Sequence, residues 1–427
     1  MTVADSHRAV EAVWRIESAR VIAALARMVN DIGLAEELAQ DALVAALEEW
    51  PRNGVPDNPG AWLTLTAKHR AIDQFRRRDT YQRKLQQIGR DMELRQEWAE
   101  AELDDALDDH IGDDLLRLIF TACHPELPVE GRLALTLRLL GGLSTAEIAR
   151  AFLAPEPTVG QRIFRAKRTL ADKQIPIELP PPAELPARLA SVLEVIYLIF
   201  NEGYAASAGE DWIRPALCQE AMRLGRVLAG LMPSEPEVHG LLALMEIQAS
   251  RIPARTAADG TPILLPDQDR SRWDRLLVRR GLDGLRRAEE LGTLGPYGLQ
   301  AAIAACHARA LTPQATDWPR IAALYRLLAH LTPSPVVELN RAVAVGMAHG
   351  PERGLEIADA LLEERTLRDY AHLPAVRGDL LARLGRTAEA AAEFHRAAGL
   401  TRNTRERELF RRRAAGLDQG SPPAGSS

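Results

Sequence analysis

Apolar residues recur at helical spacing along almost all of this 427-residue chain, and no stretch alternates clearly between apolar and polar residues. A period near 3.6 residues places apolar side chains on one face of a helix, whereas alternation is typical of a strand. With 46% apolar residues the chain can bury several helical cores. We therefore expect an all-α protein of two or three domains.

Changes in composition divide the chain into segments. Residues 79–112 are polar and acidic, and residues 175–186 are rich in proline, so both should separate helical units. The expected order is a first helical unit at 7–78, an acidic linker at 79–112, a second helical unit at 113–174, a large helical region at 187–415 and a disordered tail at 416–427.

The segment STAEIARAFLAPEPTVGQRIFRAKRTL, residues 144–170, predicts a helix, a tight turn and a second, basic helix. Ser144 and Glu147 form a capping box that sets the start of the first helix. Prolines are tolerated in the first turn of the second helix. The predicted buried face of that helix consists of Val159, Ile163, Ala166 and Leu170, and its outer face of Thr158, Gln161, Arg162, Arg165 and Arg168. Such a pair places side chains in the major groove of DNA, although a helical hairpin with a solvated basic face has the same pattern.

A second basic surface is expected between residues 59 and 78. The preceding helix, residues 34–50, should bury Leu34, Leu38, Leu43 and Leu47, and a loop WPRNGVPDNPG follows at 50–60. In the next helix apolar residues recur at helical spacing, and lysine and arginine occupy positions between them. On its own this pattern favours a solvated basic face; beside a helix-turn-helix it indicates a second contact with nucleic acid.

Two segments in this order resemble a known family. AEELAQDALVAALEEW followed by WLTLTAKHRAIDQFRRR is similar to region 2 of the extracytoplasmic-function (ECF) sigma factors of bacterial RNA polymerase. LSTAEIARAFLAPEPTVGQRIFRAKRTL is similar to their region 4. YLIFNEGYAAS, LPDQDRSRWD, GPYGLQAAIAACHA and SPVVELNRAVAV resemble a subgroup with a long C-terminal helical extension.

The resemblance implies a role for each surface. The region-2 helix would dock on the clamp helices of the largest polymerase subunit, and region 4 would contact the flap of the second largest. The implied polymerase-binding residues are Glu37, Gln40 and Asp41. The implied contacts with the −10 promoter element are Asn53, Asp57, Asn58, Trp62, Lys68, Arg70, Arg76 and Arg77. The implied contacts with the −35 element are Thr158, Gln161, Arg162, Arg165, Lys167 and Arg168, the last two holding phosphate.

Charge is segregated despite a net charge of only −6. The two proposed DNA-binding segments are basic, and the linker between them is acidic: residues 93–114 carry ten acids and one arginine. Acids of this kind would be repelled by DNA. Our hypothesis is that the linker enters a basic channel of the polymerase that nucleic acid otherwise occupies.

The large C-terminal region carries a tetratricopeptide-like signature near its end. Between residues 374 and 397 the characteristic small and large positions are Gly378, Leu381, Ala390, Phe394 and Ala397. A helical-hairpin stack of this type presents a surface for a regulatory protein or peptide. The motif NEGY at 201–204 fits either a ligand pocket or a capped helix end, and the sequence leaves both open.

Two other classes of function compete with this interpretation. A stand-alone helix-turn-helix regulator with a helical-repeat sensor accounts for the C-terminal half but leaves residues 1–78 without a role. An enzyme would have to use Asp259, Asp267, Asp269 and Asp274, yet no nucleophile or phosphate-binding motif accompanies them, and an ion-paired turn is simpler. We expect no catalysis, no metal or other cofactor, three buried free cysteines, no membrane span and a cytoplasmic protein.

Overall fold

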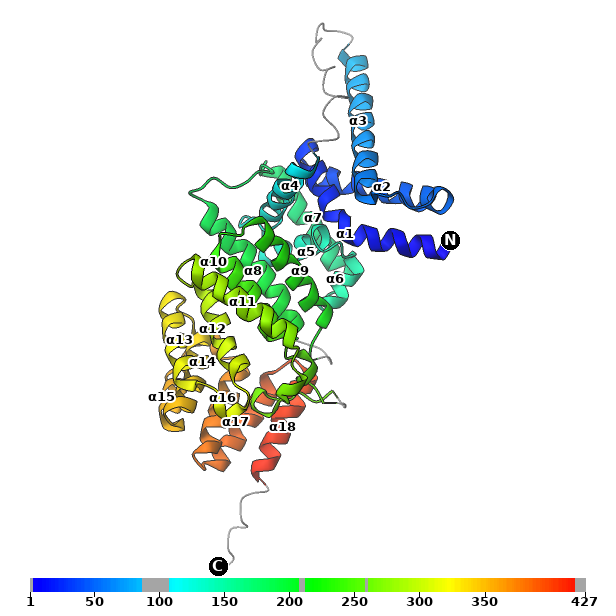
Figure 1. Cartoon of the computed structure of the whole chain (residues 1–427). Helices are drawn as coiled ribbons and strands as arrows, with labels where there is room; N and C mark the ends of the chain where they lie inside the picture. The colour runs from blue at the N-terminus through cyan, green and yellow to red at the C-terminus, as the bar shows by residue number, and fades with distance from the viewer. Residues whose placement is uncertain (1–2, 87–106, 207–211, 258–259, 419–427) are drawn as a thin grey trace, which may run out of the picture. The chain divides into compact units, whose positions relative to one another are not determined.

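The computed structural model describes residues 3–86, 107–206, 212–257 and 260–418. Within these ranges the chain forms eighteen α-helices and no β-strand, which confirms the all-α prediction (Figure 1). The helices group into two compact units, residues 1–195 (unit 1) and residues 196–427 (unit 2). None of the described helices combines the length and the apolar character that a membrane span requires.

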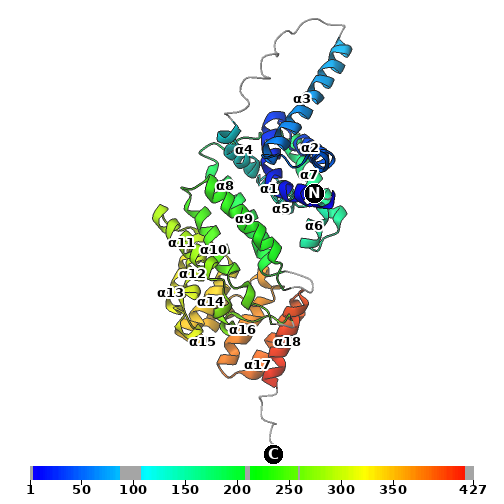
Figure 2. The same cartoon turned by 45° about the vertical axis from the view of Figure 1, so that its right-hand side comes forward.

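Unit 1 begins with three helices, α1 (Val3–Val29), α2 (Ile32–Asn53) and α3 (Pro59–Gln86). Asn30, in the left-handed region at φ 51°, follows the last residue of α1, and Asp31 is the N-cap of α2. The Asp31 carboxylate accepts the Leu34 amide at 3.0 Å. The Asn58 side chain accepts the Ala61 amide at 3.1 Å and so starts α3. In Figures 1 and 2, α3 runs well beyond the ends of its neighbours in unit 1.

The expected limits of these elements were wrong in two places. The predicted loop at 50–60 is shorter, because α2 continues through Pro51 to Asn53 and ends where Gly54 adopts φ 86°. The helix α3 continues past Arg78 to Gln86, since the residues that follow Arg78 include neither glycine nor proline and favour helix. Of the predicted acidic linker, residues 87–106 lie outside the described residues, and α4 already begins at Leu107.

The second half of unit 1 contains α4 (Leu107–Ala122), α5 (Val129–Leu139), α6 (Thr145–Ala151) and α7 (Glu156–Asp172). The capping box of α6 is confirmed: the Glu147 amide donates to the Ser144 hydroxyl at 3.2 Å and the Ser144 amide donates to the Glu147 carboxylate at 2.8 Å. The buried face of α7 consists of Val159, Ile163, Ala166 and Leu170, as predicted. Residues 144–170 therefore form the expected helix-turn-helix.

The first half of α8 (Leu185–Tyr204) belongs to unit 1, although the predicted boundary of the C-terminal region was residue 187. The buried guanidinium of Arg132 on α5 donates to the Ser191 hydroxyl at 2.5 Å and to the Glu194 carboxylate at 3.0 Å. Ser191 in turn donates to the Cys123 carbonyl at 2.6 Å. These contacts fasten α8 to α4 and α5, so residues up to Val195 are structurally part of the second helical unit.

Unit 2 continues as consecutive helices that pack on their neighbours in the chain. They are α9 (Pro215–Leu231), α10 (Pro236–Ala249), α11 (Arg275–Leu291), α12 (Pro296–Arg309), α13 (Trp318–Leu331), α14 (Pro335–His349), α15 (Pro351–Ala360), α16 (His372–Arg383), α17 (Thr387–Leu400) and α18 (Thr404–Asp418). Short 3-10 helices, η1 (Ile252–Ala254), η2 (Leu265–Asp267) and η3 (Arg270–Arg272), lie between α10 and α11. Residues 419–427, which include most of the predicted tail, lie outside the described residues.

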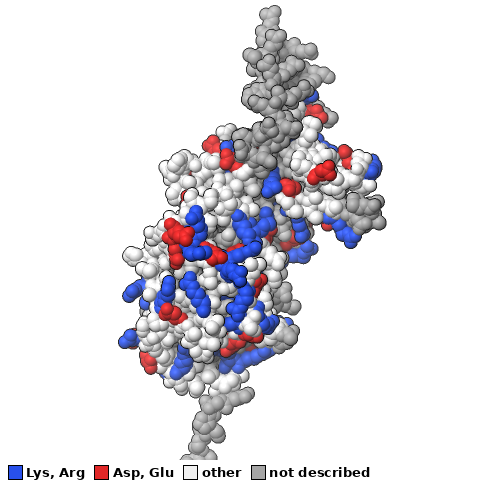
Figure 3. Space-filling view, viewed as in Figure 1, with Lys and Arg blue, Asp and Glu red and all other residues white. Residues whose placement is uncertain are grey.

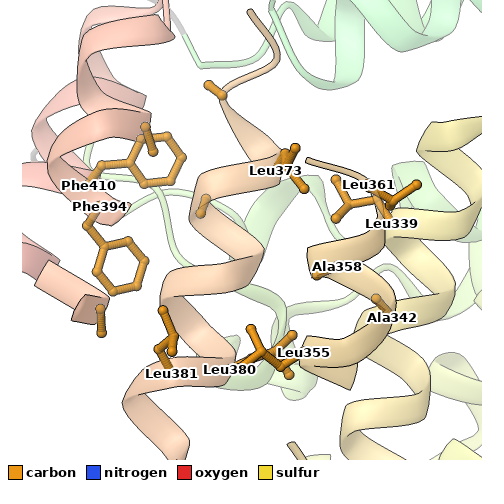
Figure 4. Close-up of a cluster of buried hydrophobic side chains, with 14 of the residues drawn as sticks. Leu339, Ala342, Leu355, Ala358, Leu361, Leu373, Leu380, Leu381, Phe394 and Phe410 are labelled. Carbon is orange, nitrogen blue, oxygen red and sulfur yellow. The ribbon is translucent and has the colours of Figure 1, made fainter. Parts of the chain in front are cut away.

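A buried cluster joins α14 to α18 in unit 2 and contains every position of the predicted repeat signature between 374 and 397 except glycine (Figure 4). Phe394 of α17 and Leu381 of α16 are each 1% exposed. A Cβ on Gly378 would lie 3.0 Å from the Phe394 ring, which explains the small residue there. The hairpins are therefore packed as predicted, while the assignment to the tetratricopeptide class stays a prediction.

Candidate nucleic-acid interface

The outer face of α7 is polar, basic and accessible. Gln161, Arg165 and Arg168 are exposed, and Thr158 and Arg162 are half-buried beside them. Arg168 forms an i,i+4 ion pair with Asp172 at 3.2 Å. In the described part of the chain, neither Arg162 nor Arg165 has an ion pair with a carboxylate. The helix thus presents two unpaired guanidinium groups and an amide, which are donors suited to base edges and phosphates.

Phe164 was not among the predicted residues, although it is 64% exposed on α7 between Gln161 and Arg165. The spacing contained the signal, because Phe164 falls outside the apolar stripe that includes Ile163. An exposed aromatic ring on this face can contact a thymine methyl group.

Lys167 points elsewhere than the rest of the basic face. Its ammonium pairs with the Glu36 carboxylate of α2, which also accepts from Arg138 Nε at 2.6 Å and from Gln40 Nε2 at 2.9 Å. Glu36 is only 5% exposed. Burial alone would raise the pKa of Glu36, but Lys167 and Arg138 outweigh it and hold the pKa below its ordinary value. The residue was missed because its partners lie 102 and 131 positions along the chain.

Glu36 lies in the helix predicted to dock on polymerase. Beside it, Glu37 is exposed, Gln40 is half-buried, and exposed Asp41 lies 3.7 Å from Arg70 of α3. The predicted leucine face was wrong in detail: only Leu38 is buried, and small residues such as Ala35, Ala39 and Ala42 form most of the inner face. Close packing of alanines leaves the longer leucines at its edges.

The first four predicted −10 residues lie at the junction of α2 and α3. Asn53, Asp57 and Asn58 are exposed there, with the Asn58 side chain used as the cap of α3. Trp62 is half-buried, with its ring edge-on to buried Trp50 at a centroid distance of 5.4 Å. The junction is therefore a short polar surface supported by two tryptophan rings.

The basic residues of α3 differ in their surroundings. Lys68 is half-buried, and its pKa is lowered by burial and by Arg27, with buried Asp114 acting in the opposite direction. Arg70 is half-buried beside Asp41, and Arg76 is exposed. Arg77 lies within α3, but its side chain is outside what the structure describes.

Two of the four aspartates considered for an enzyme, Asp269 and Asp274, act as helix caps. The Asp269 carboxylate accepts from Ser271, and the Asp274 carboxylate accepts from the amides of Leu276 and Leu277. Asp267 is the last residue of η2, and Asp259 lies outside the described residues. The ion-paired turn predicted for Asp269 with Arg270 and Arg272 was wrong, since buried Arg270 donates to carbonyl groups instead. Among the described residues no group of acidic, histidine or cysteine side chains is arranged to hold a metal ion.

Comparison with known proteins agrees with this division. Residues 15–81 match the family Sigma-70 region 2, residues 117–170 match Sigma-70, region 4, and residues 188–289 match a family of unknown function, DUF6596. An uncharacterized protein of Rhizobium meliloti is 44% identical over 395 residues, which is 92% of each chain.

Two named sigma factors match shorter stretches. The probable ECF RNA polymerase sigma factor SigI of Mycobacterium tuberculosis is 26% identical over 181 residues, 42% of this chain. The ECF RNA polymerase sigma-E factor of Escherichia coli is 39% identical over 67 residues, 16% of this chain. The chain spans 59% and 35% of the length of these two relatives.

Two sigma regions in this order, followed by a helical extension, define a transcription initiation factor rather than a classical enzyme. The chain has Sigma-70 region 2 and region 4 domains and a C-terminal DUF6596 extension, an organisation that fits an ECF sigma factor with a C-terminal extension. Sigma factors of this family interact with core RNA polymerase and with promoter DNA.

Proposed function

We propose that this chain directs core RNA polymerase to promoters through two separate DNA contacts. The outer face of α7 reads the −35 element in the major groove, and the α2–α3 junction with the basic side of α3 binds the −10 element. The observation that carries the proposal is the exposed, unpaired Arg165 beside Gln161 on a helix whose opposite face is buried. A helix presented in this way has base-reading donors that no carboxylate of the described residues occupies.

The docking surface for polymerase is the outer side of α2. Glu37 and Asp41 supply negative charge one helical turn apart, and both are exposed. We assign this side to the clamp helices of the largest subunit, and the second helical unit to the flap of the second largest. Charge complementarity of this kind sets orientation and association rate more than it sets affinity.

The contact between Glu36 and Lys167 supports a regulated state. While the ammonium of Lys167 holds the Glu36 carboxylate, it cannot bind a DNA phosphate. In one form of the protein this contact holds the two sigma regions together. In the form that binds the promoter, a DNA phosphate replaces Glu36 as the partner of Lys167. Unit 2 then controls the balance between the two forms through a regulatory protein or peptide.

Control by unit 2 is tested by a shortened chain that ends at Val195. This end point keeps Ser191 and Glu194, which fasten α8 to α5. Promoter-specific transcription that differs between the shortened and the full chain supports control. Equal transcription under every inducing condition would leave unit 2 without a regulatory role.

A mobility-shift experiment separates a sigma factor from a stand-alone regulator. The full chain should bind a promoter fragment tightly only when core polymerase is present. Tight and specific binding by the chain alone would instead indicate a regulator that uses α7 without polymerase. Each measurement needs a fixed salt concentration, since phosphate contacts make affinity strongly salt-dependent.

A further inference from the structure

Unit 2 buries three arginine side chains near the start of its hairpin stack. Arg251 and Arg255 follow α10, and Arg270 begins η3; their exposed fractions are 7%, 7% and 8%. In the described part of the chain no carboxylate lies within ion-pairing distance of any of the three. Burying a charge without a counter-ion is costly, so the compensation for these groups needs an explanation.

Two of the three have neutral partners. Arg255 donates to the Tyr204 carbonyl at the end of α8, and its guanidinium lies 3.6 Å from the centre of the Tyr204 ring. Arg270 donates to the carbonyls of His307 and Ala310 at 3.0 and 2.6 Å. NEGY is the end of α8, and its Tyr204 supplies the carbonyl and the ring that Arg255 contacts. DQDRSRWD supplies the other buried arginine, Arg270.

Arg251 has no such partner. Its Nε is buried without a hydrogen bond, and its side chain makes no hydrogen bond or ion pair in the described part of the chain. The guanidinium lies 5.7 Å from the centre of the Trp273 ring, and Arg270 lies 5.1 Å from the centre of the same ring. The tryptophan thus has two cations within contact distance, which a ring quadrupole compensates only in part.

The charge of Arg251 affects the pKa of two neighbouring groups, His307 and Tyr325. The pKa of His307 is lowered to about 3 by burial and by the charges of Arg251 and Arg270. The pKa of Tyr325 is raised to about 12, chiefly by burial and by Tyr197, with Arg251 opposing the increase. Near neutral pH the histidine is therefore uncharged and the tyrosine protonated, and the site keeps a net positive charge.

We propose that Arg251 and Arg270, beside Trp273, bind an oxyanion, namely the carboxylate or phosphate group of a small molecule. An oxyanion accepts paired hydrogen bonds from a guanidinium and supplies the missing counter-charge. Arg251 is more than nine-tenths buried, so the proposed occupant is a group on a small molecule rather than a side chain of a folded partner. All three arginines lie within residues 188–289, the part that matches a family of unknown function.

The surface of unit 2 offers a matched control. Figure 3 shows arginine side chains, drawn in blue, gathered over the part of unit 2 that contains α9 and α11. The arginines of α11 are exposed, Arg280 among them. Arg280→Met removes one positive charge from this surface, whereas Arg251→Met removes one from the buried site. Non-specific attraction of anions responds equally to both changes, and a specific site responds only to the second.

Binding is measured on the full chain by tryptophan fluorescence, with inorganic phosphate and citrate as probes against chloride at constant ionic strength. We expect the fluorescence to change saturably with at least one probe, and this change to be lost in Trp273→Phe. The dissociation constant should be at least tenfold higher in Arg251→Met and unchanged in Arg280→Met. Saturation separates binding from the general stabilisation by excluded salts, which grows steadily with concentration.

Arg251→Lys keeps the charge but lacks the paired donors, and it tests the site if the methionine variant does not fold. Its affinity should also fall at least tenfold. Any of three results would overturn the proposal. The wild type could show no saturable response, the Arg251 and Arg280 variants could have equal affinities, or the chain could bind an oligoglutamate peptide but neither small anion. The assay contains no polymerase or DNA, so its outcome is independent of the proposed sigma function.

Discussion

The carboxylate of Glu36 on α2 and the ammonium of Lys167 on α7 form an ion pair across 131 positions of the chain. The same carboxylate holds Arg138 of α5, so one buried acid joins the helix assigned to polymerase docking with the helix assigned to promoter reading. These ion pairs therefore connect the two sigma regions in the described structure.

Replacing Glu36 should therefore weaken unit 1. Glu36→Gln leaves two cations without their shared acceptor, and we expect the free energy of unfolding to fall by about 2–3 kcal/mol. Lys167 and Arg138 are about a quarter exposed and can turn towards water, which keeps the loss below that of a fully buried pair. Urea unfolding measures the effect.

A double-mutant cycle supplies the control for this pair. Lys167→Met in the Glu36→Gln background should cost less than in the wild type, because the partner is already absent. Additive losses would show that the two side chains do not interact and would remove the support for a state in which the sigma regions are held together.

Gly203, in the NEGY motif, should not tolerate a side chain. A Cβ there would lie 2.7 Å from the Cys218 amide nitrogen and 2.8 Å from the Leu217 Cβ, so α8 and α9 would have to separate. We expect Gly203→Ala to lower the free energy of unfolding by about 1–3 kcal/mol. Gly230, in α9, has no atom within 4 Å of such a Cβ, and Gly230→Ala should raise it by up to about 1 kcal/mol. Equal effects of the two changes on thermal unfolding would contradict the close helix contact.

Acid should destabilise unit 2 through His307. Its pKa in the folded chain is about 3, because of burial and the charges of Arg251 and Arg270, against about 6.5 when unfolded. Between these values the unfolded chain binds the additional proton, so stability is present at neutral pH and is lost as the pH falls. From pH 7 to 5 this one group lowers the free energy of unfolding by about 2 kcal/mol.

The variant His307→Gln isolates this contribution. Urea unfolding at pH 7 and pH 5 should show a smaller loss in the variant than in the wild type, whereas the exposed His330→Gln should behave as the wild type does. A loss in His307→Gln as large as in the wild type would mean that the buried histidine does not govern the acid response.

Local sequence signals predicted the helix-turn-helix well. The capping residues Ser144 and Glu147 lie three positions apart, and the buried face of α7 follows helical spacing, so neighbouring residues contain all the information needed. The end of α2 was harder to predict, because Pro51 suggested a break that the helix passes before Gly54 ends it.

Contacts between distant segments could not be predicted from spacing. The burial of Glu36 depends on Arg138 and Lys167, and the environment of Arg270 depends on carbonyl groups near residues 307–310. In both cases a charged residue that a local pattern assigns to the surface is buried by a helix far along the chain. The roles assigned to the promoter-contacting residues remain predictions, since they depend on DNA and polymerase.

The most direct measurement of the central claim is run-off transcription with core polymerase on a promoter of this sigma factor. We expect specific transcripts with the full chain and an unchanged transcript yield for Arg279→Ala on α11. The double variant Gln161→Ala with Arg165→Ala should lower the transcript yield at least tenfold, because each base contact contributes about 1–3 kcal/mol. A yield in the α7 double variant equal to that of the wild type, or the absence of specific transcripts with the full chain on any promoter, would contradict promoter recognition by α7.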